Sequence, residues 1–368
     1  MRDATESFSL PSDVEISSGR APAAGTAQTV ILGSRDVAAL LPMSECIDVM
    51  ADALATLARG DAVLPLRPMI RIPDSPNIFA LMPAYLGSPK TVGVKVLTVF
   101  PVNHGTAIDA HQGAVLLFEA DRGRLLAILD ATTVTAIRTA AVSAVATRLL
   151  AREDAEDLAI LGAGTQGRMH LEAIMLVRPV KRVLVWSRTT AHARALAHEA
   201  GARFGVHAEV SPTPAHAVEH ASIVCATSAS PTPIVDGDRL RPGAHVNAVG
   251  ACLPTTRELD TRAVVRARLY VDRRESALAE PGDIITPLRE GAITRDHIIA
   301  EIGELLLPSR ERLGRSSDME ITLFKSLGLA IEDLAAAHHV YRKAMERGAG
   351  QRLELGGGHT PDERTTPG

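Results

Sequence analysis

The chain has 368 residues, of which 46% are hydrophobic, 22% charged and only 3% aromatic, with a formal net charge of −4. This composition is typical of a globular protein of about two domains. It argues against nucleic-acid modules, which need aromatic stacking platforms and basic surfaces. Three widely spaced cysteines and an N-terminus without an apolar segment predict a cytoplasmic protein, and Arg138 and Arg148 interrupt the most apolar helix, so we expect no membrane contact.

The first half of the chain predicts a sheet flanked by helices. After a disordered lead-in over residues 1–28, the expected elements are a strand near 29–32, a helix from about 44, β-structure over 64–130 and a helix over 134–151. Ser44 is the expected N-cap of the first helix. Val92, Val94 and Val96 alternate along one strand, which puts Lys95 on its opposite face. Residues 121–123, Asp-Arg-Gly, predict a hairpin.

The second half alternates between strands and helices. Strands are expected at 158–161, 182–186, 207–210, 222–226, 245–249 and 269–271, with helices between most of them. Six such strands predict an α/β fold with a parallel, doubly wound sheet of the Rossmann type. A last helix is expected over 322–347, followed by a disordered tail over 348–368.

A glycine-rich turn follows the strand at 158–161. It consists of Gly162, Ala163, Gly164, Thr165, Gln166 and Gly167, which fit the pattern GxGxxG between a strand and a helix. Gly162 permits the tight turn, Gly164 lets the backbone approach a pyrophosphate, and Gly167 allows close packing of helix and strand. The helix N-terminus supplies amide donors for the phosphates. The turn therefore predicts a dinucleotide site.

The end of the next strand predicts which dinucleotide binds. NAD sites carry an acid there for the ribose 2′-hydroxyl, whereas NADP sites carry a basic residue for the 2′-phosphate. This chain has Ser187, Arg188 and Thr189 at that point and no acid. Since Arg188 can pair with a phosphate and both hydroxyls can donate to it, we expect NADPH, with NADH as the alternative.

Six ordered segments make the chain resemble the ornithine cyclodeaminase/mu-crystallin family. They are residues 82–85 (MPAY), 93–95 (GVK), 111–118 (HQGAVLLF), 137–143 (IRTAAVS), 247–250 (NAVG) and 324–328 (FKSLG). The resemblance implies a homodimer that acts at the α-carbon of an amino or imino acid. It also implies a substrate and dimerisation domain over 29–140 plus 320–347, interrupted by a Rossmann nucleotide domain over 141–319.

Three basic residues match the family's substrate-binding positions: Arg67, Lys95 and Arg138. A substrate of this class carries a carboxylate, which needs a fixed cationic partner in a partly desolvated cleft. Lys95 and Arg138 are the candidate catalytic residues, because Lys95 can hold the carboxylate or manage a proton on the substrate nitrogen. The resemblance also implies cofactor contacts from His111, Thr227, Val249 and Ser326. Asp130 and Glu280 are further candidates, for which surface or loop roles are equally good readings.

The chain departs from cyclodeaminases at Cys252 and Leu253, where those enzymes carry an acid–base aspartate. Ketimine reductases of the mu-crystallin branch also lack it, and their Asn-Arg-Thr resembles Ser187-Arg188-Thr189. The resemblance therefore implies NADPH-dependent reduction of cyclic ketimines such as Δ1-pyrroline-2-carboxylate or Δ1-piperideine-2-carboxylate, to proline or pipecolate. The alternatives are an ornithine or lysine cyclodeaminase, a dehydrogenase of alanine or N-substituted amino acids, and a non-enzymatic NADPH-binding protein. No ligand spacing in the chain predicts a metal site.

Overall fold

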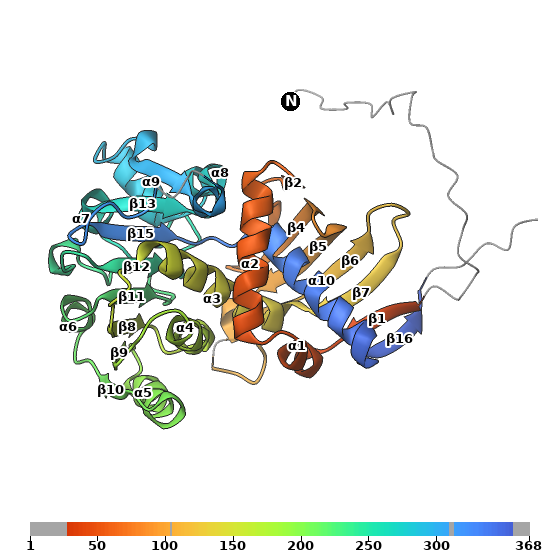
Figure 1. The fold of residues 1–368 in the computed structure, drawn as a ribbon, viewed down its shortest axis with the longest axis horizontal. Helices are drawn as coiled ribbons and strands as arrows, with labels where there is room; N and C mark the ends of the chain where they lie inside the picture. The colour runs from red at the N-terminus through yellow and green to blue at the C-terminus, as the bar shows by residue number, and fades with distance from the viewer. Residues whose placement is uncertain (1–27, 104, 309–312, 356–368) are drawn as a thin grey trace, which may run out of the picture.

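The computed structural model describes residues 28–103, 105–308 and 313–355, and two large sheets organise them (Figure 1). The first sheet has the order β16-β1-β7-β6-β5-β4-β2, with β3 paired to β4, and the second has the order β10-β9-β8-β11-β12-β15-β13-β14. The predicted lead-in over 1–28 lies outside the described residues except for Gln28, which begins β1.

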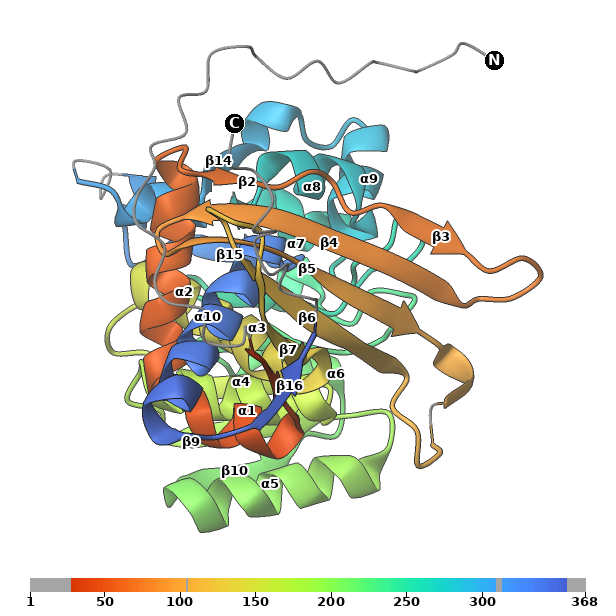
Figure 2. The same ribbon diagram turned by 90° about the vertical axis from the view of Figure 1, so that its right-hand side faces the viewer.

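The first sheet is mainly antiparallel. Its strands are β1 (Gln28–Leu32), β2 (Ala62–Val63), β3 (Met69–Arg71), β4 (Ile78–Gly87), β5 (Lys90–Val99), β6 (His111–Glu119), β7 (Leu125–Asp130) and β16 (Gln351–Glu354). Strands β4, β5 and β6 run side by side (Figure 2). The predicted hairpin joins β6 to β7, where Gly123 has a φ of 68°.

The second sheet is parallel throughout, as the alternation of elements predicts. Its strands are β8 (Asp157–Leu161), β9 (Arg182–Trp186), β10 (His207–Val210), β11 (Ile223–Ala226), β12 (His245–Ala248), β13 (Ala267–Val271), β14 (Ile298–Glu301) and β15 (Ile321–Lys325). Parallel sheets are covered on both faces, and the central strands β11 and β12 are buried at every residue.

Ten α-helices and four short 3₁₀ turns complete the described residues. The helices are α1 (Ser34–Leu40), α2 (Met43–Ala58), α3 (Ala131–Leu150), α4 (Thr165–Met175), α5 (Thr190–Phe204), α6 (Pro214–Glu219), α7 (Thr261–Arg266), α8 (Arg274–Ala279), α9 (Gly282–Arg289) and α10 (Ala330–Arg347). The 3₁₀ turns are η1 (Pro101–Asn103), η2 (Gly237–Arg239), η3 (Arg295–His297) and η4 (Ile302–Leu306). None of these helices is long and apolar enough to cross a bilayer.

Two segments carry the chain between the sheets, and both reach the site described below. Helix α3 leaves β7 of the first sheet and leads to β8 of the second. It is an Ala- and Val-rich helix buried on almost every side, and Asp130 caps it by accepting a hydrogen bond from the Thr133 amide at 2.8 Å. Residues 326–329 lead back from β15 to α10, which packs across β4, β5 and β6.

The structure corrects the expected last helix and the tail. Residues 321–325 form β15, fully buried between β12 and β13, and the helix begins only at Ala330. The apolar spacing around Leu323 and Leu327 fits a helix and a buried strand alike, and Gly328, at a φ of 80°, separates the two elements. Residues 351–354, expected in the disordered tail, pair with β1, because the antiparallel ladder satisfies their backbone groups.

Three smaller differences concern the start of α2, the strand β14 and the expected domain boundary at residue 320. Helix α2 begins at Met43 with Pro42 at its N-cap, so Ser44 lies inside the first turn. Strand β14 was not predicted from the sequence. The expected boundary at residue 320 puts β15 with the first sheet, whereas its backbone pairs within the second. The partners of a buried parallel strand are far apart in sequence, so pairing is not readable locally.

Candidate active site

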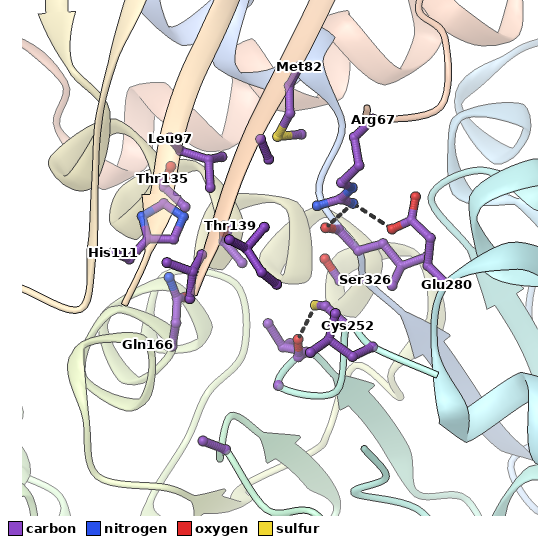
Figure 3. Close-up of a pocket in the computed structure, with 18 of the residues that line it drawn as sticks. Arg67, Met82, Leu97, His111, Thr135, Thr139, Gln166, Cys252, Glu280 and Ser326 are labelled. Carbon is purple, nitrogen blue, oxygen red and sulfur yellow. Dashed lines mark hydrogen bonds and ion pairs between the residues drawn. The ribbon is translucent and has the colours of Figure 1, made fainter. Parts of the chain in front are cut away.

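A cavity of about 500 Å³ lies between the two sheets (Figure 3). Strands β4, β5 and β6 of the first sheet, helix α3, and the loops after β11, β12 and β15 all contribute side chains to it. Eight of the expected site residues line it: Arg67, Lys95, His111, Arg138, Gln166, Thr227, Val249 and Ser326. The rest of the glycine turn and residues 187–189 lie outside the lining, at the ends of β8 and β9.

The glycine turn has the backbone that its sequence predicts. Gly162 has a φ of 116°, and a Cβ there would press on the backbone of Thr227 at 2.7 Å. The Thr227 hydroxyl donates a hydrogen bond to the Gly162 carbonyl at 3.1 Å. A Cβ on Gly167 would clash with that same carbonyl, whereas Gly164 faces open space at the N-terminus of α4. The turn therefore leaves room for a pyrophosphate where the helix amides begin.

Residues 187–189 lie next to this turn. The Gly162 amide donates a hydrogen bond to the Trp186 carbonyl at 2.9 Å, so the end of β9 adjoins the turn. Arg188 and Thr189 are exposed, and Thr189 occupies the N-cap of α5 without a side-chain hydrogen bond. An exposed guanidinium beside a dinucleotide turn suits a ribose 2′-phosphate.

Two buried polar atoms of the cavity lining lack a hydrogen-bond partner among the described residues. They are Oε1 of Gln166, on the first turn of α4, and Oγ of Ser326, directly after β15. Buried polar atoms are normally paired, so these two are suited to a polar ligand in the cavity. His111 lines the same cavity, and burial together with the charges of Lys95 and Arg138 lowers the pKa of His111 to about 4. The imidazole is therefore neutral near pH 7.

Lys95 and Arg138 meet at a shared carboxylate on α10. Nζ of Lys95 lies 2.7 Å from Oδ2 of Asp333, and Nε of Arg138 donates to Oδ1 of Asp333 at 2.9 Å. Nη1 of Arg138 donates to Oε2 of Glu332 at 2.7 Å. All four side chains are at most 4% exposed, so they form a buried ion cluster, which we call the α10 cluster. The remaining nitrogen of Arg138, Nη2, donates no hydrogen bond to a described residue.

The pKa shifts in the α10 cluster follow from burial and neighbouring charge. Burial lowers the pKa of Lys95 to about 8, against the opposing effect of Asp333. Arg138 and Lys95 outweigh the burial of Asp333 and lower the pKa of that carboxyl. Burial raises the pKa of Glu332 to about 7. Asp333 is therefore a fixed negative charge that holds two cations at the cavity wall.

Arg67 reaches the cavity from the segment between β2 and β3. Its Nη2 donates to the carbonyls of Leu327 at 3.0 Å and Gly328 at 3.2 Å, and it lies 2.9 Å from Oε2 of Glu280. A Cβ on Gly328 would clash with the Arg138 guanidinium, so Arg67 and Arg138 both border the backbone of Gly328. The three predicted cations thus converge on one end of the cavity, as a shared carboxylate ligand requires.

Buried carboxylates hold the loops that surround the cavity. Glu258 accepts hydrogen bonds from the amides of Ser228 and Gly250, both at 2.6 Å, and so joins the ends of β11 and β12. Asp272 accepts from the amides of Leu327 at 2.5 Å and Gly328 at 2.8 Å, which fixes the loop after β15. These backbone bonds are strong because the acceptors are ionisable groups in a buried setting.

Cys252 and Glu280 lie on the same side of the cavity as Arg67 (Figure 3). The Cys252 thiol donates to the Val249 carbonyl at 3.4 Å, and burial raises the pKa of the thiol. Glu280 ends α8, and Pro281 follows it. Asp130, in contrast, serves as the cap of α3. Among the described residues, no group of three or more His, Cys, Asp and Glu side chains has a metal-binding arrangement.

The sequence predicted no site role for the two acids of the α10 cluster or for the two carboxylates that bind the loops. Glu332 and Asp333 were expected only as part of a helix, and Glu258 and Asp272 received no role. One signal was available for the first pair: two adjacent acids on a helix whose neighbours are Leu and Ala require buried cationic partners. For Glu258 and Asp272 no local signal existed, because their partners are backbone amides of distant loops.

Comparisons with known proteins place the chain in a family. The family model described as "Ornithine cyclodeaminase/mu-crystallin family" matches residues 27–348. A Δ1-pyrroline-2-carboxylate reductase of Bacillus cereus is 36% identical over 327 residues, a match that covers 89% of this chain and 100% of the relative. The mouse ketimine reductase mu-crystallin is 37% identical over 325 residues, or 88% of this chain and 97% of the relative.

A solved structure resembles the whole arrangement. The Δ1-pyrroline-2-carboxylate reductase of Thermococcus litoralis, in complex with NADH and L-proline, has a TM-score of 0.85 and 36% sequence identity. The match covers 88% of this chain and 100% of that one. The likeness therefore extends over both sheets and the cavity between them.

Proposed function

The chain belongs to the ornithine cyclodeaminase/mu-crystallin family, and from this premise we propose that it is an oxidoreductase that reduces cyclic ketimines with NADPH. Δ1-Pyrroline-2-carboxylate and Δ1-piperideine-2-carboxylate are the substrates, and proline and pipecolate are the products. The observation that carries the proposal is the convergence of Arg67, Lys95 and Arg138 on one cavity that also reaches Gln166 of the glycine turn. The reductases compared above support it.

Arg67, Lys95 and Arg138 hold the substrate carboxylate. Nη1 of Arg67 and Nη2 of Arg138 donate no hydrogen bond to a described residue, so both are free for a ligand beside Gly328. A charge-assisted hydrogen bond of this kind contributes about 1.5–3 kcal/mol. Because Asp333 fixes Lys95 and Arg138, the carboxylate meets preformed charges, and the α-carbon is held in one orientation.

The cofactor residues fit a reduced nicotinamide dinucleotide, which supplies a hydride when bound. The turn at Gly162–Gly167 takes the pyrophosphate, and Ser187, Arg188 and Thr189 take the 2′-phosphate. The two unpartnered atoms, Oε1 of Gln166 and Oγ of Ser326, support a polar head group inside the cavity. His111, Thr227 and Val249 border the same space. NADPH is preferred because of Arg188, and NADH is the alternative, which the Thermococcus litoralis structure contains.

The residues at 252 and 253 favour ketimine reduction over cyclodeamination. A cyclodeaminase needs an acid–base group on the amino groups of its substrate, and neither a leucine nor a thiol of raised pKa provides one. Leu253 and Cys252 instead line the cavity on the side of the second sheet without contributing an acid, and Met82 and Leu97 add apolar side chains from the first sheet. A ring of methylene groups fits that lining better than a second ammonium group.

We also propose a homodimer that works in the cytoplasm. One face of the first sheet supports the dimer, because partly exposed apolar side chains cover it: Leu81, Pro83, Tyr85, Val92, Val94, Val96, Leu116, Phe118 and Ile128. Such a face normally marks a protein contact. The cytoplasm is favoured because Cys46, Cys225 and Cys252 are all free thiols.

The decisive experiment follows the absorbance of the reduced nicotinamide with the purified protein. Both cyclic ketimines are offered with NADPH and with NADH, and ornithine, lysine and alanine are offered with the oxidised cofactors. We expect imine reduction and a preference for NADPH. In Arg188→Ala, KM for NADPH should rise about tenfold or more while KM for NADH stays unchanged, because one charge-assisted contact is lost. Turnover of ornithine with NAD⁺ and no imine reduction would overturn the proposal.

A further inference from the structure

Glu280 is a carboxylic acid at the substrate end of the cavity. Its side chain is 11% exposed, and its Oε2 lies 2.9 Å from Nη2 of Arg67. The end of α8 holds it there, since the Glu280 amide donates to the Ser276 carbonyl at 2.9 Å and Pro281 stops the helix. Glu280 thus borders the same guanidinium that we assign to the substrate carboxylate.

Reduction of an imine also needs a proton on nitrogen, and six described residues that line the cavity are titratable. They are Arg67, Lys95, His111, Arg138, Cys252 and Glu280. The two arginines do not release protons. His111 is neutral near pH 7, because burial lowers its pKa to about 4, and burial raises the pKa of the Cys252 thiol. Two proton donors remain, Lys95 and Glu280.

Lys95 is better suited to hold charge than to give up a proton. Its ammonium group lies 2.7 Å from Asp333 and donates to the Thr135 hydroxyl at 3.3 Å. Loss of its proton would leave the buried Asp333 carboxylate with one cation fewer, which is costly in a buried site. Neutralising Glu280 carries no such cost once the substrate carboxylate shares the Arg67 guanidinium.

On the basis of the proposed function, we infer that Glu280 is the catalytic acid that protonates the imine nitrogen. An α-imino acid presents its carboxylate and its nitrogen on adjacent atoms. When the carboxylate binds Nη1 of Arg67, the nitrogen therefore comes next to the group on Nη2, which is Glu280.

In this proposal, substrate binding causes Glu280 to become protonated. Burial and Asp272 raise the pKa of Glu280, and Arg67 opposes them. Cys252, the other titratable group beside it, is neutral. Once the substrate carboxylate shares Arg67, the opposing effect weakens and a like charge arrives, so Glu280 takes up a proton from solvent. The α-carbon then accepts a hydride, the π pair of the C=N bond moves to nitrogen, and nitrogen takes the proton of Glu280, which returns to a carboxylate.

A substrate that needs no proton tests this role. In an N-methyl-Δ1-pyrrolinium-2-carboxylate the nitrogen is already alkylated and charged, so hydride transfer alone completes its reduction. For Glu280→Gln we expect kcat with the ordinary imine to fall about 100-fold or more, the usual contribution of a general acid, and kcat with the iminium to stay close to that of the wild type. Glu280→Asp should recover part of the imine activity.

Two control variants separate this role from others. Glu275→Gln changes an exposed glutamate of the same helix, 53% exposed, and should leave both substrates unaffected. Lys95→Met should raise KM for imine and iminium alike, because it removes a charge that binds both carboxylates. Equal losses of imine and iminium reduction in Glu280→Gln would overturn the inference, as would full imine activity.

Proton uptake gives a second measurement that does not depend on turnover. Pyrrole-2-carboxylate, a planar analogue that is not reduced, is mixed at pH 7 with the protein in weak buffer containing a pH indicator. The wild type should take up protons on binding, as expected for a carboxyl group whose pKa rises, and Glu280→Gln should lack this uptake. Equal uptake by both proteins would contradict the inference. If the wild type reduces neither imine nor iminium with either cofactor, the proposed function itself fails.

Discussion

Asp333 is the residue on which the substrate end of the cavity depends. It binds Lys95 through one oxygen and Arg138 through the other, at 2.7 and 2.9 Å, and is itself fully buried. Buried ion pairs rarely stabilise a fold, since desolvation offsets their attraction. In the proposed function their value is that they hold two cations in fixed positions at the cavity wall.

Removing the charge of Asp333 should therefore destabilise the protein strongly. Asp333→Asn leaves two buried cations with Glu332 as their nearest acid, and we expect the free energy of unfolding to fall by about 3–5 kcal/mol. Denaturant titration monitored by circular dichroism measures it. Asp48→Asn is the matched control, because Asp48 pairs with Arg148 at 75% exposure and such pairs contribute about 0–1 kcal/mol. Equal losses in both variants would contradict the role of burial.

At the scale of elements, the parallel strands position the loops around the cavity. Individual buried carboxylates then link these loops to one another. Strands β11 and β12 are neighbours, and their carboxyl ends lead into the loops at Ser228 and Gly250. Glu258 binds one amide from each loop. Asp283 accepts in turn from the Glu258 amide at 2.8 Å and pairs with Lys325 at the end of β15. Three strand ends are thus tied through two carboxylates.

Replacement of Glu258 should loosen these loops and weaken cofactor binding. In Glu258→Gln one of the two amides meets an NH₂ group in place of an acceptor, and a buried unsatisfied donor costs about 1–3 kcal/mol. We expect that decrease in the free energy of unfolding and a higher Kd for NADPH, measured by quenching of protein fluorescence. Glu219→Gln, an exposed glutamate on α6, is the control and should match the wild type. An unchanged Kd would show that the loops keep their shape without Glu258.

The elements that local pattern predicts are those whose partners are near in sequence. The β6–β7 hairpin, the glycine turn and the alternation from β8 to β13 were all expected and are confirmed. Strand β15 was read as a helix because its five buried residues carry no period of their own. The convergence of Arg67, Lys95 and Arg138 was expected from family resemblance alone, since no spacing relates residues 67 and 138. The pairing of Arg67 with Glu280 depends on tertiary structure and was not predicted from the sequence.

At the scale of the whole molecule, the valine stripe of β5 has an unusual role. An apolar stripe normally faces a core, yet Val92, Val94 and Val96 face outward, and Lys95 faces the interior. Asp333 on α10 explains the inward lysine, and the proposed dimer would cover the outward valines. The same reversal therefore supports both the substrate site and the proposed dimer.

A charge on this face should break the dimer. Val92→Glu buries an unpaired carboxylate in each half of the proposed interface, which costs several kcal/mol, and we expect the dimer dissociation constant to rise about 100-fold or more. Light scattering after size-exclusion chromatography measures the mass. Val265→Glu is the control, because Val265 on α7 is equally exposed, at 38% against 37% for Val92. A monomeric wild type would contradict the proposed dimer.

The two crossings of the chain, α3 and residues 326–329, have a mechanical consequence. Both border the cavity, through Thr135, Arg138 and Thr139 on the first and Ser326 and Leu327 on the second. Any rotation of one sheet against the other must pivot on these two segments, since no other described segment joins the sheets covalently. In the proposed function, residues at this hinge also bind the ligand, so the axis lies beside the ligand. Closure would then change the approach of nicotinamide and imine by small angles while the carboxylate anchor stays at the axis.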